Sequence, residues 1–580
     1  MTKPIFFSEY QPRTFADIFA DTLARLGLKQ LFGIPGGPIS SLIYSISNHS
    51  ELSIMYPFHE TTAAYMAMGY TLSSPTRDQI GVCFTTAGPG LLNVVNGVAS
   101  ASEERVPILV VTGNVAAALR GKGAVQDSFD TGIDGSRIMS AICAESISVE
   151  HPDEVVSSIL SLYQTALETR RPVHISLPAD ILGARVAQPM NYPLLPDLDR
   201  YGENIPLSFD IAIKKLALAR RPLIFAGNGI KTAKLKTELL QFAETHQFPV
   251  VVTSHATGIF PQTHPLYVGN YGLGATDEAG RKIKQYKPDC LLILGSRMGE
   301  LATGWSTIFS QPKYKIHVDI EKDQPRRVYD VDIRLPMRLE TFFLKSRRGL
   351  TQHRGQRETG KFFHEKTEIA ANSVPVCPAG PNTVHPAQIM DVLPDLIPQN
   401  GIIWSDIGNT MTWALNRLVL RGEQDFHVAL GLGSMGSSIG SAIGSKLASP
   451  QRPVVALCGD CAALMYAGDF FSGRNVPIVF VVLNDQGAGM VDHGHRLLGL
   501  DNNVNVRLDK SPEFAELANA LHLNGFRVTS IMQLMTLPWD KIWTSSSSTL
   551  IEVKIDGSIV PPIQNRAKVF GASESGGNNE

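Results

Sequence analysis

Residues Val454–Met490, VVALCGDCAALMYAGDFFSGRNVPIVFVVLNDQGAGM, contain the pattern that decides the fold. A first apolar run of β-forming residues ends in Gly459-Asp460, and a helical pattern follows it. A second apolar run ends in Asn484-Asp485. Two parallel strands joined by a helix would place the two aspartates side by side at the carboxyl edge of a sheet, where open α/β sheets bind ligands.

Two carboxylates at neighbouring strand ends suit a Mg²⁺ ion that carries a diphosphate. Magnesium in such sites uses one or two carboxylates, and phosphate supplies other oxygen ligands. Glycines let the backbone approach the phosphate closely, and a following helix N-terminus favours its charge. The alternative is an ordinary strand–helix–strand unit whose strands end in aspartate. The stretch therefore predicts a magnesium–diphosphate site, with that alternative left open.

The composition indicates a globular protein of several domains. The chain has 580 residues, of which 43% are hydrophobic and 18% charged, and this length predicts about three or four domains. The formal net charge of −2 gives no electrostatic reason to expect binding to nucleic acid or to an anionic membrane. No apolar run approaches the roughly 18 residues of a membrane helix, and the N-terminus lacks the apolar core of a signal peptide. We expect a cytoplasmic protein.

The six cysteines are too sparse for a disulfide framework in a chain of this length. Cys458 and Cys461 form a C-x-x-C pair, which leaves a zinc site or a redox dithiol as alternatives. A zinc site would need a second pair of ligands, and none is visible in the sequence. The pair also lies inside the Gly459-Asp460 turn rather than at the start of a free helix.

Strand and helix patterns alternate along the whole chain, which predicts the α/β class with three doubly wound parallel-sheet domains. The expected domains span residues 1–186, 208–344 and 383–560. Proline-rich or basic linkers are expected at 187–207 and 345–382, and the tail 561–580 is expected to be disordered at its end. Thr14 is expected to cap a first helix, and the predicted strands include Leu31–Ile34, Ile80–Thr86, Pro107–Thr112, Val173–Pro178, Leu223–Ala226, Pro249–Thr253, Leu291–Leu294 and Ile316–Ile320.

The stretch that opens this section resembles the Mg²⁺–diphosphate motif of thiamine diphosphate (ThDP) enzymes, which reads Gly-Asp-Gly and, roughly two dozen residues later, Asn-Asn. Cys461 replaces the third glycine here, and Asp485 replaces the second asparagine. The first change is expected to crowd the diphosphate turn, and the second keeps an oxygen ligand but adds a negative charge. The resemblance implies that Asp460, Asp485 and the Gly487 carbonyl bind the metal.

The segment Phe58–Tyr70 looks like the part of these enzymes that carries the cofactor-activating glutamate. The resemblance implies that Glu60 hydrogen-bonds the aminopyrimidine ring and thereby promotes loss of the thiazolium C2 proton. Taken alone, Glu60 is better explained as an acid favoured by the dipole of a helix N-terminus, and the aspartate motif downstream reverses that preference. His59 is open between a structural and a functional role.

Residues Gly431–Gly436 satisfy the dinucleotide pattern G-x-G-x-x-G, with an acid following at Asp460. The same segment looks like the ThDP region in which a methionine wedges under the cofactor. By that resemblance Met435 would hold the cofactor bent, and the Gly433 carbonyl would accept its 4′-amino group, which brings the two rings together for proton transfer. The ThDP interpretation explains Glu60, Met435 and both aspartates together, whereas the dinucleotide one explains only the glycines and one acid.

Within the ThDP enzymes the chain is most similar to the acetolactate synthase and acetohydroxyacid synthase group, over about residues 12–560. The matching pieces include Ala87–Gly90, Ala124–Asp127, Ser405–Asn409 and Gly489–Val491. The resemblance implies that Gln126 reaches the reacting cofactor from a loop and that ThDP binding also involves Pro35, Pro89, Asn93, Asn409, Thr410, Cys461, Ala462 and Met490. Many members also bind FAD in the middle domain; Gly269–Gly272 and Gly295–Arg297 match that site only loosely, so FAD is not the expectation.

Three departures from this group concern the acceptor pocket. Leu301 aligns with an arginine that holds an acceptor carboxylate, Gly494 with a tryptophan, and Val125 with a phenylalanine. A charge-assisted hydrogen bond of the kind that Leu301 cannot make contributes about 1.5–3 kcal/mol. These smaller, neutral side chains predict a roomier acceptor pocket that is less selective for a carboxylate.

We therefore expect a carboligase that decarboxylates a 2-oxo acid, such as pyruvate, and joins it to a carbonyl or acyl acceptor larger than pyruvate to give an α-hydroxyketone. An ordinary acetolactate synthase, a simple 2-oxo acid decarboxylase or C–C lyase, and a non-catalytic ThDP-fold protein are the alternatives. The family pattern also implies a homodimer or homotetramer whose active sites lie at the subunit interface.

Overall fold

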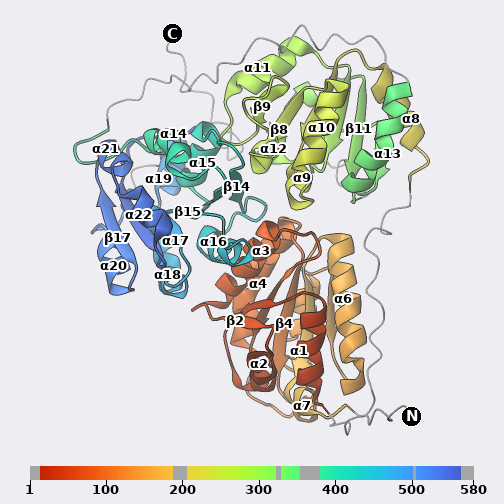
Figure 1. Ribbon diagram of the computed structural model, residues 1–580, viewed down its shortest axis with the longest axis vertical. Helices are drawn as coiled ribbons and strands as arrows, with labels where there is room; N and C mark the ends of the chain where they lie inside the picture. The colour runs from red at the N-terminus through yellow and green to blue at the C-terminus, as the bar shows by residue number, and fades with distance from the viewer. Residues whose placement is uncertain (1–12, 187–204, 322–327, 353–378, 501–504, 563–580) are drawn as a thin grey trace, which may run out of the picture. The chain divides into compact units, whose positions relative to one another are not determined.

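The computed structural model describes residues 13–186, 205–321, 328–352, 379–500 and 505–562 (Figure 1). It contains three six-stranded sheets, and all strand pairs within them are parallel. Helices connect the strands, so the predicted α/β class is confirmed. The chain divides into two compact units, Met1–Asp197 with the first sheet and Leu198–Glu580 with the other two.

The first sheet has the order β2-β1-β3-β4-β6-β5. The predicted helix cap at Thr14 is confirmed, because its side chain accepts a hydrogen bond from the Asp17 backbone N–H and the Asp17 carboxylate accepts one from the Thr14 backbone N–H. The strands are β1 (Gln30–Gly33), β2 (Ser53–Met55), β3 (Gly81–Thr85), β4 (Ile108–Asn114), β5 (Glu145–Ser148) and β6 (Val173–Pro178). The helices are α1 (Phe15–Arg25), α2 (Ser40–Ser47), α3 (Glu60–Ser73), α4 (Pro89–Glu103), α5 (Gly135–Ser140), α6 (Val155–Thr169) and α7 (Ala179–Gly183).

The second sheet has the order β12-β11-β10-β7-β8-β9. Its strands are β7 (Pro222–Ala226), β8 (Val250–Thr253), β9 (Tyr267–Tyr271), β10 (Cys290–Leu294), β11 (Tyr314–Asp319) and β12 (Ile333–Pro336). The helices are α8 (Phe209–Leu218), α9 (Asn228–Thr232), α10 (Lys236–His246), α11 (Asp277–Tyr286), α12 (Glu300–Thr303) and α13 (Leu339–Gln352).

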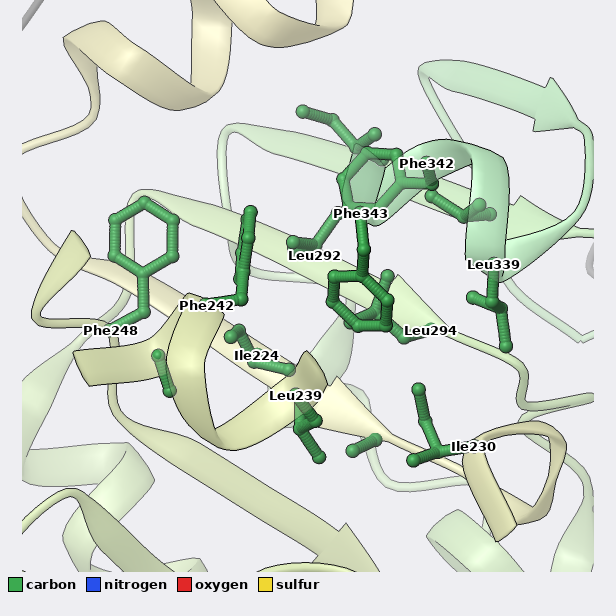
Figure 2. Packing of buried hydrophobic residues seen from close by; sticks show 14 of the residues in the cluster. Ile224, Ile230, Leu239, Phe242, Phe248, Leu292, Leu294, Leu339, Phe342 and Phe343 are labelled. Carbon is green, nitrogen blue, oxygen red and sulfur yellow. The ribbon is translucent and has the colours of Figure 1, made fainter. Parts of the chain in front are cut away.

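Both faces of this second sheet are covered, as the apolar runs predict for a parallel sheet. Leu292 and Leu294 of β10 enter one hydrophobic cluster, and Leu291 and Ile293 enter another, because alternate side chains of a strand point to opposite faces. Figure 2 shows the first cluster, in which phenylalanines of α10 and α13 lie over β7 and β10.

The third sheet has the order β14-β13-β15-β16-β18-β17. β15 and β16 are neighbours with Gly459 paired to Leu483, as the opening stretch predicts. The strands are β13 (Ile402–Ser405), β14 (Asp425–Val428), β15 (Val454–Gly459), β16 (Val479–Asn484), β17 (Asn524–Val528) and β18 (Thr549–Lys554). The helices are α14 (Pro386–Leu396), α15 (Asn409–Arg417), α16 (Ser437–Ala448), α17 (Asp460–Met465), α18 (Ala467–Ser472), α19 (Gly489–Leu497), α20 (Phe514–Ala520), α21 (Ile531–Met535) and α22 (Trp539–Thr544).

Most of the two expected linkers and nearly all of the expected tail lie outside the described residues. The exception at 345–382 is α13, which continues to Gln352. No helix within the described ranges is both long enough and apolar enough to span a membrane.

Candidate functional site

Asp460 and Asp485 follow directly after neighbouring strands at the carboxyl edge of the third sheet. The Asp460 carboxylate accepts hydrogen bonds from the backbone N–H groups of Gly487 (2.9 Å) and Cys461 (2.6 Å). Burial raises the pKa of Asp485 to about 6, and the negative charge of Asp460 adds to this effect. Burial also raises the pKa of Asp460. Two buried carboxyl groups that repel each other form an environment that a divalent cation would stabilise.

The surroundings of this pair fit a diphosphate as well as a metal. A Cβ atom on Gly489, the first residue of α19, would lie 2.2 Å from Asp485 Oδ2 and 2.9 Å from Asn409 Nδ2, so the carboxylate and the amide meet at this glycine. The Asn409 Oδ1 atom is buried and has no hydrogen-bond partner. Gly408, at φ +123°, and Gly433 both face open space. The glycines form a cradle that leaves room for a diphosphate, whereas the unsatisfied Asn409 oxygen can only accept and therefore suits a cation or a donor group of a ligand.

The other predicted residues of this edge lie on the same or adjoining elements. Thr410 follows Asn409 in α15, and its Oγ1 is 3.9 Å from the Cβ that Gly459 would carry. Cys461 and Ala462 are in the first turn of α17, and Met490 is in the first turn of α19, partly buried against the core.

Asp406 fixes the loop that carries Gly433 and Met435. Its fully buried carboxylate accepts hydrogen bonds from the N–H groups of Gly436 (2.8 Å) and Ser438 (3.0 Å) and from the Ser438 hydroxyl (2.8 Å). Sequence reasoning placed Asp406 in a motif but gave it no role. It holds the turn in which Gly436 adopts a left-handed φ of +84°.

The dinucleotide interpretation of Gly431–Gly436 is wrong. In such a site the glycine loop follows one strand. The acid follows the next strand in the chain, which lies beside the first in the sheet. Here the loop follows β14, which is the edge strand, and β13 separates β14 from β15, the strand that precedes Asp460.

The C-x-x-C pair does not have the properties of a reactive dithiol. Burial raises the pKa of Cys458 well above the usual value for a thiol. Burial, followed by the charge of Asp460, raises the pKa of Cys461 to about 11. Both thiols are therefore protonated at neutral pH, whereas reactive cysteines are thiolates. Across the described residues no group of three or more His, Cys, Asp and Glu side chains is arranged to hold a metal ion, and a two-carboxylate magnesium site lies below that number.

In the N-terminal unit, Glu60 is the first residue of α3 and is buried. Its Oε2 atom accepts a hydrogen bond from Asn93 Nδ2 at 3.0 Å. His59 caps the same helix, since its Nδ1 accepts a hydrogen bond from the Thr61 backbone (3.1 Å). This cap is the role of His59 that the structure shows. The Glu60 carboxyl group is buried at the start of a helix and accepts a hydrogen bond from an amide. It can therefore still form a hydrogen bond with a ligand.

Further predicted residues gather at the same edge of the first sheet. Pro89 opens α4 directly after Gly88, and a Cβ on Gly88 would lie 3.0 Å from the Gln126 side chain. Gln126 itself has a left-handed φ of +65°. Pro35 precedes Gly36, whose Cβ would lie 2.4 Å from Thr86 at the end of β3. The neighbouring Val125 is 85% exposed.

Leu301, on α12, lines a cavity of about 860 Å³. Tyr271 and Trp305 contribute aromatic surface to this cavity. Arg281 and Lys284 of α11 contribute positive charge, and Asp277 and Glu300 contribute an equal number of negative charges. Sequence reasoning missed these two cations, because no motif marks them. Gly494 lies on α19, and a Cβ there would have no atom within 4 Å. Arg507 and His493, which contact Asp485 and Asn409, were also missed.

Three family models match the sequence and together cover more than half of it. They are described as thiamine pyrophosphate enzyme, N-terminal TPP binding domain (residues 13–133), central domain (209–343) and C-terminal TPP binding domain (406–553). Thiamine pyrophosphate is another name for ThDP.

Three similar proteins are named as acetolactate synthase large subunits. The probable acetolactate synthase large subunit of Methanocaldococcus jannaschii is 28% identical, covering 94% of this chain and 93% of its own. The acetolactate synthase large subunit of Haemophilus influenzae is 24% identical, with 95% and 96% covered. The isozyme 2 large subunit of Escherichia coli is 25% identical, with 92% and 95% covered.

Proposed function

Since this chain belongs to the thiamine pyrophosphate enzyme family and is of the acetolactate synthase type, we propose that it joins the acyl part of a 2-oxo acid to an acceptor larger than pyruvate. The family makes it a C–C bond-forming enzyme that uses ThDP and Mg²⁺. In the proposed reaction the donor, such as pyruvate, loses CO₂. Its former keto carbon then forms a bond to the acceptor carbonyl carbon, and the acceptor oxygen takes up a proton to give an α-hydroxyketone.

The residues have separate tasks in this proposal. Asp460, Asp485 and the Gly487 carbonyl would hold Mg²⁺, while Asn409 would donate to the diphosphate. When bound, ThDP supplies the carbanion needed to break and make bonds next to a carbonyl. Glu60 would hold a proton on the aminopyrimidine ring, and its burial keeps water from competing for that hydrogen bond.

The cavity beside Leu301 is the observation that carries the choice of acceptor. Its volume of about 860 Å³ lies within the range of sites for ligands much larger than pyruvate. Leu301, Tyr271 and Trp305 give it apolar and aromatic surface. Arg281 and Lys284 bring positive charge to the lining, while Asp277 and Glu300 bring negative charge, so the lining gives no net preference for an anionic acceptor.

A mixed incubation tests the proposal. Purified protein with ThDP, Mg²⁺, pyruvate and a bulky aldehyde or acyl acceptor should give mainly the mixed product. Gly494→Trp should abolish that preference and leave pyruvate decarboxylation largely intact. Gly183→Trp, at a second glycine with no atom within 4 Å of its Cβ, is the matched control and should behave as wild type. Acetolactate as the dominant product despite the competing acceptor would show that the enzyme is an ordinary acetolactate synthase.

We also propose that the chain forms a homodimer or homotetramer and that Glu60 of one subunit completes the site built by Asp460 and Asp485 of another. The basis is the family resemblance.

A further inference from the structure

Arg507 reaches the predicted metal loop through a short backbone pairing. The Ala488 N–H donates to the Val506 carbonyl (3.1 Å), and the Leu508 N–H donates to the Gln486 carbonyl (2.8 Å). Gly487 and Arg507 thereby form an antiparallel bridge. A Cβ on Gly487 would lie 2.8 Å from the Arg507 Cα, so the glycine permits this close approach. The bridge places the arginine beside the carboxyl edge of β16.

The guanidinium group of Arg507 donates hydrogen bonds to three neighbours. Its Nη1 atom donates to the Asp485 carbonyl (2.7 Å) and to Asp485 Oδ2 (3.2 Å). Its Nε and Nη2 atoms donate to Asp492 Oδ2 at 3.1 and 2.5 Å. Nη2 also donates to the Gly557 carbonyl (3.0 Å). Such a fork fixes direction as well as charge, which a lysine cannot do.

The same Gly557 carbonyl connects this cluster to the diphosphate side of the site. The buried His493 ring bridges that carbonyl, at 3.0 Å from Nε2, and the Asn409 amide, at 3.2 Å from Nδ1. The carbonyl can only accept, so Nε2 carries the proton and Nδ1 accepts from Asn409. Arg507 and His493 thus orient Asp485 and Asn409, which meet at Gly489.

The charge balance explains why an arginine is present. Asp485 adds a carboxylate beside Asp460, and its side chain is only 9% exposed. Asp492 brings a third carboxylate to the same guanidinium. Without a cation, this surplus negative charge would repel the diphosphate of an incoming cofactor. The positive charge of Arg507 offsets it at the position where the surplus arises.

We infer that Arg507 is a positioning residue that holds Asp485 toward the metal ion and offsets the charge of this additional carboxylate, so that an anionic diphosphate can bind. This inference rests on the proposed ThDP–Mg²⁺ site. It predicts opposite effects on the two ligands: without Arg507 the carboxylates attract a bare divalent cation more strongly, while they repel the diphosphate. If Arg507 had a purely structural role, its loss would weaken the binding of the divalent cation and of the diphosphate together.

The test measures the two affinities separately in wild type, Arg507→Gln, Asp485→Asn and the double variant. Calorimetry gives ThDP affinity at saturating Mg²⁺, and electron paramagnetic resonance gives the affinity for Mn²⁺ added alone. Arg507→Gln should weaken ThDP binding about tenfold or more and leave Mn²⁺ binding equal or tighter. Asp485→Asn should suppress this loss, so the double variant should lie within about threefold of Asp485→Asn alone.

Two further variants serve as controls. Arg496→Gln removes the other guanidinium that contacts Asp492 Oδ2, at 2.9 Å, without touching Asp485, and should match wild type. Arg507→Lys keeps the charge but not the fork, so it should lose less ThDP affinity than Arg507→Gln without reaching the wild-type value. Thermal melting verifies that each variant is folded.

The outcomes separate this inference from the function it rests on. Two results would overturn the role of Arg507 while leaving the metal site in place. In the first, Arg507→Gln binds ThDP and Mn²⁺ like wild type. In the second, it loses affinity for both, and Asp485→Asn does not suppress the loss. ThDP binding to wild type that is indifferent to a chelator would overturn the metal site itself, and the inference with it.

Discussion

The first and third sheets of this protein share one strand order but present different chemistry at corresponding edges. Counted within each domain, both run second-first-third-fourth-sixth-fifth, as β2-β1-β3-β4-β6-β5 and β14-β13-β15-β16-β18-β17. Glu60 starts the helix after the second strand of one sheet, and Met435 lies two residues before the helix after the second strand of the other. The scaffold is thus common to both, and the residues at the strand ends decide the chemistry.

The electrostatic difference between the two edges is clear. The edge at Glu60 holds a carboxyl group that accepts a hydrogen bond from the neutral amide of Asn93. The edge at Asp460 and Asp485 holds two carboxyl groups and an arginine. A single buried acid can be stabilised by a hydrogen bond, whereas neighbouring acids need a cation. The first edge therefore suits proton exchange, and the second suits metal-bound phosphate.

The largest expected effect comes from Glu60→Gln. The amide keeps the size of the side chain but cannot exchange the proton, so turnover should fall by at least about a hundredfold. Binding of ThDP and the folded state should be retained, which calorimetry and circular dichroism would verify. Glu104→Gln, at another buried glutamate of the same unit, is the control. Near-wild-type turnover of Glu60→Gln would remove the assigned role of this edge.

The second prediction concerns the metal edge and the subunit interface. Asp460→Ala removes a metal ligand and should abolish Mg²⁺-dependent ThDP binding, measured by calorimetry with and without chelator. Mixing this inactive variant with inactive Glu60→Gln protein should restore part of the activity, since one intact site forms if the two residues come from different subunits. Failure of all mixtures, despite verified subunit exchange, would show that each chain builds its own site.

The smallest expected effect contrasts glycines at the two edges. Gly489→Ala would place a Cβ 2.2 Å from Asp485 Oδ2 and should weaken ThDP binding about tenfold. Gly90→Ala would place one 3.0 Å from Thr86 Cγ2 and 3.5 Å from Glu60 Oε1, contacts that small shifts relieve, so turnover should change less than about threefold. If Gly90→Ala lowered turnover by the same factor as Gly489→Ala lowers ThDP affinity, the view that only the metal edge is tightly packed around charged groups would be wrong.

Much of this site could be predicted because its residues directly follow strongly apolar strands. The runs before Asp460 and Asp485 are fully buried strands, and local pattern identifies such strands well. Several strands were not predicted. Among them, the edge strands β2, β12 and β17 are partly exposed and their residues carry little apolar pattern, whereas β13 and β18 are buried and were missed in spite of their apolar residues.

The α/β class, the pairing of β15 with β16 and the ThDP family could be predicted from the sequence, because each is marked by apolar runs or motifs of a few consecutive residues. Only the tertiary structure decided that Arg507 reaches Asp485, that His493 links Asn409 to Gly557, and that Arg281 and Lys284 line the cavity beside Leu301. These contacts depend on a backbone bridge, a bridging ring or a shared cavity wall, and not on the apolar pattern of either segment. No local pattern encodes them, since the cost of an uncompensated charge arises only once the chain has folded.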